Sequence, residues 1–281
     1  MQLIANLGIN WWTKGDAKQR GIDLIDAAKE SGAHVICVPY LRADRMFRPQ
    51  PLIDATKKFD MQPELLYDWM VHAESIGLGF IVSPRHVEAV GYLEQINVDG
   101  YHINNGDINF KPLLKEIRDT GKPVYLSTGM ATLSEVGDAI GILLGDKLPE
   151  DTNLVVLHST GAMPTPSEDS QLGRILDLAQ EFFPLYVGFE SFVRNQLLDY
   201  IAMAYRPHVI MRRLDLDDKK GVETEYSLTP SQFKELANVA VAVHLVNNPE
   251  VYHDGFTESD FDARIKQMRC KDTEYLLPPE S

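Results

Sequence analysis

Polar residues close short apolar runs at several points in this chain. Residues 124–127 form one such run, which ends in Ser127 and is followed by Thr128. Residues 154–157 form a second run, and His158 and Ser159 come directly after it. Runs of this length are typical of strands that are buried on both faces of a parallel sheet. Because α/β proteins bind ligands at the carboxyl ends of such strands, these polar residues are candidates for a functional site.

The same pattern recurs at other strand ends and extends the set of candidates. Their side chains carry hydroxyl, amide, imidazole, carboxylate and guanidinium groups. The candidates are Ser83, Arg85, His102, Asn105, Ser127, Thr128, His158, Ser159, Glu190 and Arg213. Histidine and arginine at several strand ends of an acidic chain favour a ligand with carboxylate or phosphate groups. The sequence therefore predicts a site for an anionic small molecule.

Two of these candidates also have structural interpretations that the sequence leaves open. The alternative to a functional role for His158 is a hydrogen bond between its ring and a backbone carbonyl. Arg212 and Arg213 are adjacent, so only one of them can point inward from a strand. We expect the other arginine to be a solvated surface charge.

The composition is that of a soluble globular protein and argues against several classes of partner. The 281 residues are 44% hydrophobic, and the formal net charge is −14. That charge argues against nucleic acid or an anionic membrane. No apolar run approaches the roughly 20 residues that span a bilayer, and the first residues lack the pattern of a signal peptide. Two cysteines form neither a disulfide framework nor a zinc cluster, so we expect a cytoplasmic protein.

Strand and helix signals alternate eight times along the chain. The predicted strands lie at 3–7, 35–38, 79–82, 101–103, 124–127, 154–157, 185–189 and 209–211. The predicted helices lie at 16–31, 63–76, 86–96, 110–119, 168–182, 191–204 and 230–246, with one more that begins after an N-cap at Thr132 or Ser134. Residues 40–62 form one long connection. Eight such repeats predict an α/β protein with a single closed (β/α)₈ TIM barrel.

The domain organisation follows from this count. We expect one barrel domain over residues 1–247 and no second domain. The acidic tail, residues 248–281, is expected to pack on the barrel. The alternative for the tail is a contact in a homo-oligomer, which one sequence does not establish.

Several strings carry a family resemblance. The chain reads IANLGIN from residue 4, GKPVYLSTGMATLSEV over 121–136, LVVLHSTGAMPTPSED over 154–169 and GVETEYSLTPSQFKEL over 221–236. These strings resemble segments of the sialic acid synthase family, which comprises N-acetylneuraminate synthase and its pseudaminic and legionaminic acid relatives. The likeness covers nearly the whole predicted barrel. The family usually adds a small antifreeze-like domain, which we do not expect here.

The resemblance implies a reaction that joins phosphoenolpyruvate to an N-acylated amino sugar, with a divalent metal held by two histidines. The residues at the two matching positions are Phe192 and Arg213. A phenyl ring has no metal-binding atom, and a guanidinium group does not give up its proton to bind one. The match therefore predicts that the family's metal site is missing, and we expect neither a metal nor a cofactor.

The replacements in the matched pocket are polar. His102 stands at the place of a lysine, Asn105 at that of a serine, and Glu223 at that of an aspartate, so Glu223 joins the substrate-binding candidates. Arg213 would supply a fixed positive charge that can clamp a carboxylate. A histidine such as His102 titrates near neutral pH and can act as an acid or a base.

Three functions remain open on this evidence. The first is a metal-independent enzyme that acts on an anionic sugar acid or phosphosugar, with carbon–carbon bond chemistry related to that of the family. Its catalytic candidates are His102, His158 and Glu190, which in an alternative interpretation form a relocated metal site. The second is a non-catalytic homologue that binds a ligand or a partner subunit. The third is a working synthase that uses phosphoenolpyruvate.

Overall fold

The computed structural model describes residues 1–13 and 15–246. Eight parallel strands close into a barrel in the order β1 to β8, and β8 pairs with β1. The strands are β1 (Gln2–Asn6), β2 (Val35–Tyr40), β3 (Gly79–Pro84), β4 (Gly100–Ile103), β5 (Val124–Ser127), β6 (Leu154–His158), β7 (Tyr186–Ser191) and β8 (Val209–Arg213). This arrangement confirms the barrel that the sequence predicts.

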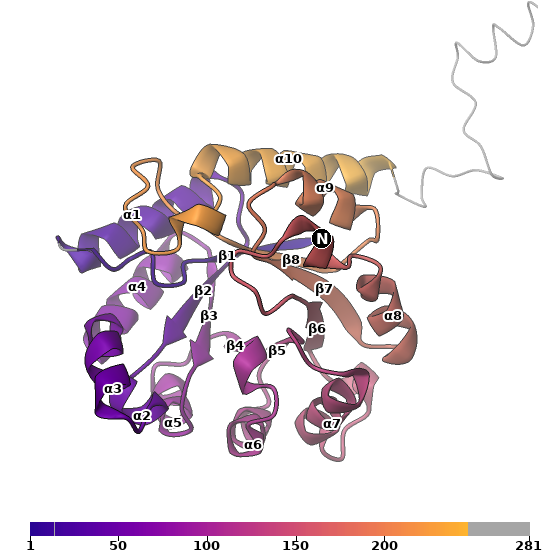
Figure 1. The fold of residues 1–281 in the computed structure, drawn as a ribbon, viewed down its shortest axis with the longest axis horizontal. Coiled ribbons are helices and arrows are strands. Elements are labelled where there is room, and N and C mark those ends of the chain that lie inside the picture. Colours follow the sequence, from indigo (N-terminus) through magenta and orange to yellow (C-terminus); the bar gives the residue numbers. More distant parts are fainter. Residues whose placement is uncertain (14, 247–281) are drawn as a thin grey trace, which may run out of the picture. The chain divides into compact units, whose positions relative to one another are not determined.

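Helices lie around the strands (Figure 1). They are α1 (Ala17–Glu30), α4 (Pro63–Ser75), α5 (Glu88–Gln95), α6 (Lys111–Thr120), α7 (Leu133–Leu144), α8 (Arg174–Glu181), α9 (Leu197–Met203) and α10 (Pro230–Val246). The long connection at 40–62 contains two further short helices, α2 (Ala43–Met46) and α3 (Gln50–Thr56). Two predicted helices were too long at their beginnings, because residues 191 and 168–170 belong to β7 and to a 3₁₀ turn.

Helix α7 shows how local sequence fixes an element beside the candidate site. Thr132 is its N-cap, and the side chains and backbones of Thr132 and Glu135 form a reciprocal capping box. Such a cap satisfies donors that a helix N-terminus leaves unpaired. The cap fixes where the loop after β5 ends and the helix begins.

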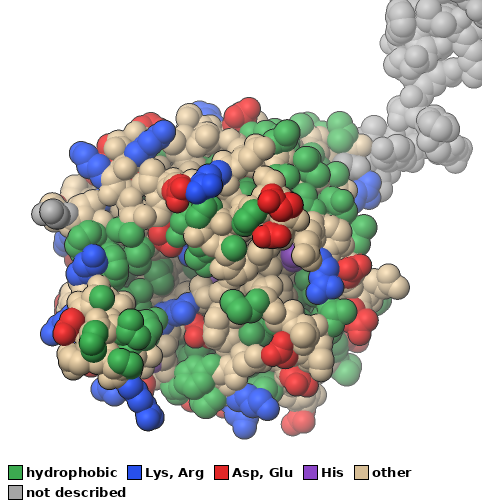
Figure 2. Space-filling model, in the orientation of Figure 1, with side chains coloured by type: hydrophobic (Ala, Val, Ile, Leu, Met, Phe, Trp, Pro, Cys, Tyr) green, Lys and Arg blue, Asp and Glu red, His purple; other side chains and the backbone are tan. Residues whose placement is uncertain are grey.

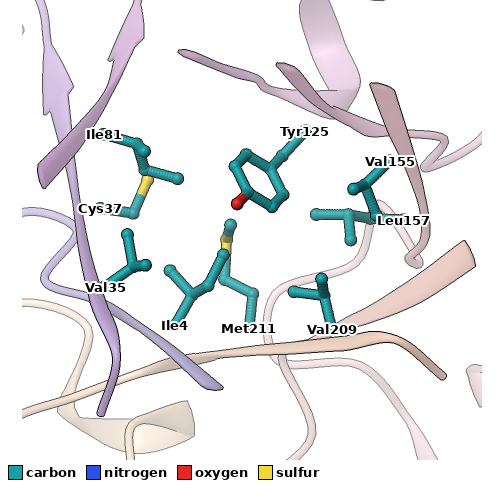
Figure 3. Close-up of a cluster of buried hydrophobic side chains, with 9 residues drawn as sticks. All are labelled: Ile4, Val35, Cys37, Ile81, Tyr125, Val155, Leu157, Val209 and Met211. Carbon is teal, nitrogen blue, oxygen red and sulfur yellow. The ribbon is translucent and has the colours of Figure 1, made fainter. Parts of the chain in front are cut away.

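Apolar side chains fill the barrel interior (Figure 3). They come from six strands, namely Ile4, Val35, Cys37, Ile81, Tyr125, Val155, Leu157, Val209 and Met211. Gly188 belongs to β7, where an added Cβ would lie 2.5 Å from the Leu157 side chain, so only glycine fits at this close approach. Because side chains alternate along a strand, the residues next to these core members point outward.

The sequence-predicted tail, residues 248–281, lies outside the described residues. Met1–Val241 form one compact unit. The boundary proposed at residue 247 stays a prediction. None of the helices in the described part of the chain is long and apolar enough to cross a membrane.

Candidate active site

A hydrogen-bonded chain of three side chains lies at the carboxyl ends of β4, β5 and β7. The hydroxyl of Ser127 donates to Glu190 Oε2 at 2.6 Å, and its oxygen lies 2.8 Å from Nε2 of His102. The two ionisable groups are 3.7 Å apart. At most 2% of each of the three residues is exposed. We call these three residues the inward triad.

The hydrogen bonds assign the protons of the inward triad. Because the single hydroxyl proton of Ser127 goes to Glu190, Nε2 of His102 must donate to the hydroxyl oxygen. In the neutral imidazole this leaves Nδ1 with a free lone pair. Burial would raise the pKa of Glu190, but His102, Arg213 and the Ser127 hydroxyl outweigh it and hold that pKa below its usual value. Glu190 is therefore an ionised carboxylate.

Arg213 extends the triad toward β8 and the loop that follows it. Its Nε is 3.3 Å from Glu223 Oε2, and its Nη1 is 4.0 Å from Glu190 Oε1. Burial opposes its charge, but these two carboxylates raise the pKa of Arg213 above its usual value. The guanidinium carbon also lies 5.2 Å from the ring centroid of Phe192, close enough for a cation–π contact. Arg213 is a fixed cation with a carboxylate on either side.

Glu223 is held in place by groups from two separate loops. Its Oε2 accepts a hydrogen bond from the backbone N–H of Ile9 at 2.9 Å, and its Oε1 accepts one from the hydroxyl of Tyr226 at 2.9 Å. Burial and the nearby Glu223 carboxylate raise the pKa of Tyr226, so this phenol stays a donor. Sequence reasoning missed Tyr226, although it lies three residues after Glu223 in the matched segment.

A second polar group follows β3 and β4. Arg85 Nε lies 3.2 Å from Asp107 Oδ2, and burial raises the pKa of Asp107 although Arg85 lowers it. Ser83 and Asn105 are buried beside the same strand ends. Asp107 was also missed by sequence reasoning, although it lies two residues after Asn105 on the turn that follows β4.

Several enclosed polar atoms of these two groups have no hydrogen-bond partner in the described part of the chain. They are Ser83 Oγ, Arg85 Nε, His102 Nδ1, Asn105 Nδ2, Asp107 Oδ2, Glu190 Oε1, and Arg213 Nε and Nη1. Buried polar groups are usually hydrogen-bonded, and an unpaired one costs roughly 1–3 kcal/mol. These eight atoms therefore mark a place where a polar ligand or water would complete the bonding.

The sequence grouped His158 with His102 and Glu190 as catalytic candidates, and the structure separates His158 from the other two. Leu157 points into the barrel, so His158, the next residue of β6, points outward. Its Nε2 bonds to the backbone carbonyl of Ser170 at 2.8 Å. His102, His158 and Glu190 therefore do not form a common metal site, and no group of three or more possible ligands occurs among the described residues.

Thr128 and Ser159 connect the loops after β5 and β6. The Thr128 hydroxyl donates to the Leu157 carbonyl at 3.2 Å, and Ser159 Oγ accepts from the backbone N–H of Gly129 at 2.9 Å. Both hydroxyls thus have backbone partners in neighbouring segments. Their predicted role in binding substrate stays a prediction.

The predicted site for an anion is less positive than its histidine and arginines suggested. His102, Arg85 and Arg213 each have a carboxylate within 4.0 Å. The predicted cations are therefore largely neutralised by their neighbours. On the face in Figure 2, acidic and basic side chains are likewise interspersed.

Arg212 is not the solvated surface charge that the sequence suggested. It is 1% exposed and lies on the outer face of β8, with its Nε 3.3 Å from Asp199 Oδ2 of α9. Its guanidinium donates to the carbonyls of Ser191 and Val193 and to the Ser191 hydroxyl at 2.9–3.0 Å. Arg212 is a buried structural side chain.

The residues at the family's metal-binding positions do not fit a metal. Phe192 is 1% exposed, offers only a hydrocarbon ring, and carries the guanidinium of Arg213 above it. That guanidinium is itself a positive charge and has no lone pair to donate. In the structure, as in the sequence, the side chains at these two positions lack the metal-binding atoms that the family's histidines supply.

The fold and the position of these groups define a general class, a (β/α)₈ barrel with a polar cluster at the carboxyl ends of its strands. Within that class, the chain belongs to the NeuB family, whose model matches residues 24–249. The family assignment agrees with the resemblance seen in the sequence.

Curated relatives are similar over most of the barrel. The chain is 32% identical over 238 residues to the uncharacterized protein MJ1065 of Methanocaldococcus jannaschii. The match covers 84% of this chain and 68% of that protein. It is 28% identical over 185 residues to N,N'-diacetyllegionaminic acid synthase of Campylobacter jejuni, covering 66% of this chain and 55% of the synthase. For the N-acetylneuraminate-9-phosphate synthase of Homo sapiens the identity is 29% over 167 residues, 59% of this chain and 45% of the enzyme. The chain thus spans about half the length of these two synthases.

Solved structures support the fold. An N-acetylneuraminic acid synthetase from Leptospira borgpetersenii in complex with citrate has a TM-score of 0.82 at 19% identity, covering 94% of this chain and 90% of that one. A truncated 3-deoxy-D-arabino-heptulosonate 7-phosphate synthase from Thermotoga maritima has a TM-score of 0.66 at 14% identity, covering 87% of each chain. At these identities the likeness concerns the fold alone.

Proposed function

We propose that this NeuB-family protein is an enzyme of carbohydrate biosynthesis that acts on an anionic sugar acid or phosphosugar without the family's metal. The observation that carries the proposal is the set of unpaired polar atoms around the inward triad and Arg213. The set contains both donors and acceptors. A polyhydroxylated ligand with one anionic group can pair with both kinds.

The inward triad is suited to proton transfer. Nδ1 of His102 has no hydrogen-bond partner among the described residues, and Nε2 is committed to Ser127, so Nδ1 is the ring nitrogen left to face a ligand. Glu190, kept ionised, fixes the orientation of the Ser127 hydroxyl and lies close enough to stabilise a positive charge on the imidazole. In this proposal His102 takes up or delivers a proton at Nδ1, and Glu190 acts through Ser127.

Arg213 is suited to hold the anionic group of the ligand. It makes ion-pair contacts with Glu190 and Glu223, yet neither its Nε nor its Nη1 has a hydrogen-bond partner among the described residues. These N–H groups remain available to a carboxylate or phosphate, for which guanidinium is the preferred side chain. Asn105 Nδ2 and Ser83 Oγ are further unpaired groups, at the ends of β3 and β4.

A second candidate function is ligand binding without catalysis. The pairing of each predicted cation with a carboxylate favours this alternative. A buried cluster whose charges are balanced can serve only to hold the side chains of the barrel interior in one arrangement. In that case the protein would bind a ligand or a partner subunit and turn nothing over.

The proposal is tested by screening sugar acids and phosphosugars, with and without phosphoenolpyruvate, in the presence of EDTA. Binding is followed by thermal shift and product formation by mass spectrometry. Glu190→Gln should abolish turnover while the matched control Glu181→Gln, an exposed carboxylate on α8, leaves it intact. Binding without turnover would select the non-catalytic alternative. Turnover that requires added metal would select a conventional synthase.

A further inference from the structure

A separate pocket lies on the outer side of β5 and β6, between helices α7 and α8. It has a volume of about 400 Å³ and is lined by the loops after the two strands and by parts of both helices. Pockets for small ligands typically measure about 300–1,000 Å³. We call this cavity the outer pocket. It lies on the opposite side of the strands from the inward triad, because His158, which lines it, alternates with the inward Leu157.

His158 presents one free ring nitrogen in this pocket. Its Nε2 donates to the Ser170 carbonyl, so in the neutral ring Nδ1 is an acceptor. Burial and the nearby Arg174 lower the pKa of His158, which keeps the ring neutral. The ring is fixed by stacking on Phe189 at 5.8 Å between centroids. Although His158 is only 5% exposed, Nδ1 has no hydrogen-bond partner among the described residues.

Arg174 places a cation in the same pocket. It is the first residue of α8, and its nearest carboxylate, Asp177, lies 3.9 Å away without a hydrogen bond within the described part of the chain. Its guanidinium donors are therefore available to a ligand. The apolar side chains of Leu133, Val136 and Leu178 form another part of the lining.

We propose that the outer pocket binds a small carboxylate that carries a hydroxyl or amino group and a short apolar body. The carboxylate pairs with Arg174, the hydroxyl or amino group donates to His158 Nδ1, and the apolar body packs on Leu133, Val136 and Leu178. All three groups of the ligand have a matching partner in the pocket. This proposal is independent of the function proposed for the inward triad.

Part of the lining of the outer pocket follows a member of the inward triad directly in the sequence. Thr128 and Gly129 line it and follow Ser127 directly, and Gly129 donates to Ser159, which lines it as well. A ligand in the pocket therefore contacts the segment that holds the Ser127 hydroxyl. Binding there is expected to shift the resonances of residues 127–129 as well as those of His158.

Isothermal titration of the full chain with three probes tests the assignment. The probes are 2-hydroxy-4-methylpentanoate, its neutral amide, and 4-methylpentanoate, which lacks the hydroxyl. Since a charge-assisted hydrogen bond is worth about tenfold or more in affinity, the amide should bind at least about tenfold more weakly than the hydroxy acid. The acid without the hydroxyl should bind more weakly by a smaller factor.

Two arginine variants locate the binding. Arg174→Gln should weaken the hydroxy acid by about tenfold or more, whereas Arg118→Gln, an arginine of α6 that is paired with Asp119, should leave it unchanged. Ala131→Leu, which fills the pocket, should also weaken it. The proposal is overturned if no probe shows saturable binding at millimolar concentration, if acid and amide bind equally, or if Glu190→Gln rather than Arg174→Gln removes binding.

Discussion

Arg212 and Arg213 are neighbours in β8 and lie on opposite faces of the strand. Arg212 points outward, donates to the carbonyls of Ser191 and Val193, and pairs with Asp199. Arg213 points inward, and its Nε and Nη1 have no hydrogen-bond partner in the described part of the chain. Both side chains are buried. Nε lacks a hydrogen-bond partner in both arginines, but the two terminal nitrogens of Arg212 are bonded to backbone and hydroxyl oxygens, whereas Nη1 of Arg213 is not. The two arginines therefore differ in how far the surrounding protein satisfies the end of the guanidinium, and we propose that this end of Arg213 binds a ligand.

The largest effect is expected from Arg212→Ala. It would leave Asp199 buried without its cation, and breaking a buried pair from one side costs about 3–5 kcal/mol. Urea denaturation followed by circular dichroism measures this loss in the free energy of unfolding. A loss below about 1 kcal/mol, which is the range of surface ion pairs, would contradict the structural role of Arg212. It would also remove the difference drawn between Arg212 and Arg213.

Arg213→Ala is the matched substitution on the inner face. It should weaken an anionic sugar ligand by about one to two decades, because each charge-assisted hydrogen bond is worth roughly 1.5–3 kcal/mol. The substitution also leaves the Glu190 and Glu223 carboxylates without their cation, which lowers the free energy of unfolding. The fold should nevertheless persist, because Glu223 keeps its hydrogen bonds from Ile9 and Tyr226, and Glu190 keeps the one from Ser127. Calorimetry measures the affinity. Unchanged affinity would mean that Arg213 serves only its two carboxylates.

Glu190→Gln tests the charge of the inward triad through pH. Because the folded pKa of Glu190 is held below its unfolded value of about 4.3, its ionisation stabilises the fold above that value. This contribution is lost as the pH falls through the folded pKa. The wild type should therefore exceed Glu190→Gln in stability by about 1.5 kcal/mol at neutral pH. The gap should close in acid below about pH 4.3. A gap that is constant from neutral to acid pH would show that Glu190 is not ionised.

The smallest effect is expected from Phe192→Leu. It removes the ring under Arg213 but keeps an apolar side chain. A desolvated cation–π contact is worth about 2 kcal/mol, and this loss falls on the free and the ligand-bound protein alike. Ligand affinity should fall by only a few-fold, and the bonds of Arg212 to Ser191 and Val193 should be unaffected. Metal analysis should give the same metal content for this variant and for the wild type. Metal retained by the wild type and lost from the variant would contradict the account of these two positions.

Much of the fold could be predicted because apolar runs and caps are local signals. The run at 124–127 coincides with β5, and Thr132, one of the two residues that the sequence offered as an N-cap, caps α7. The helix beginnings at 168 and 191 were misplaced because Ser167 and Ser191 are residue types that favour an N-cap, whereas the true N-caps, Gly173 and Gln196, make no side-chain cap hydrogen bond.

The candidate site was less predictable because it depends on strand register and on distant partners. A shift of one residue decides whether a side chain faces the core or the helices, and the sequence alone did not show that His158 faces outward. Asp199, 13 residues before Arg212, meets it only through the packing of α9 on the barrel. The pairing of Arg85 with Asp107 and of Arg213 with Glu223 likewise arises only from the closed barrel.

The central claim is that the inward triad and Arg213 bind an anionic sugar acid or phosphosugar without a metal. Calorimetric titration of such ligands into EDTA-treated protein, beside Arg212→Ala and Arg213→Ala, tests it most directly. The account predicts saturable binding in EDTA that Arg213→Ala weakens by about one to two decades and that folded Arg212→Ala retains. Binding that appears only when manganese or magnesium is restored, or that survives Arg213→Ala unchanged, would contradict it.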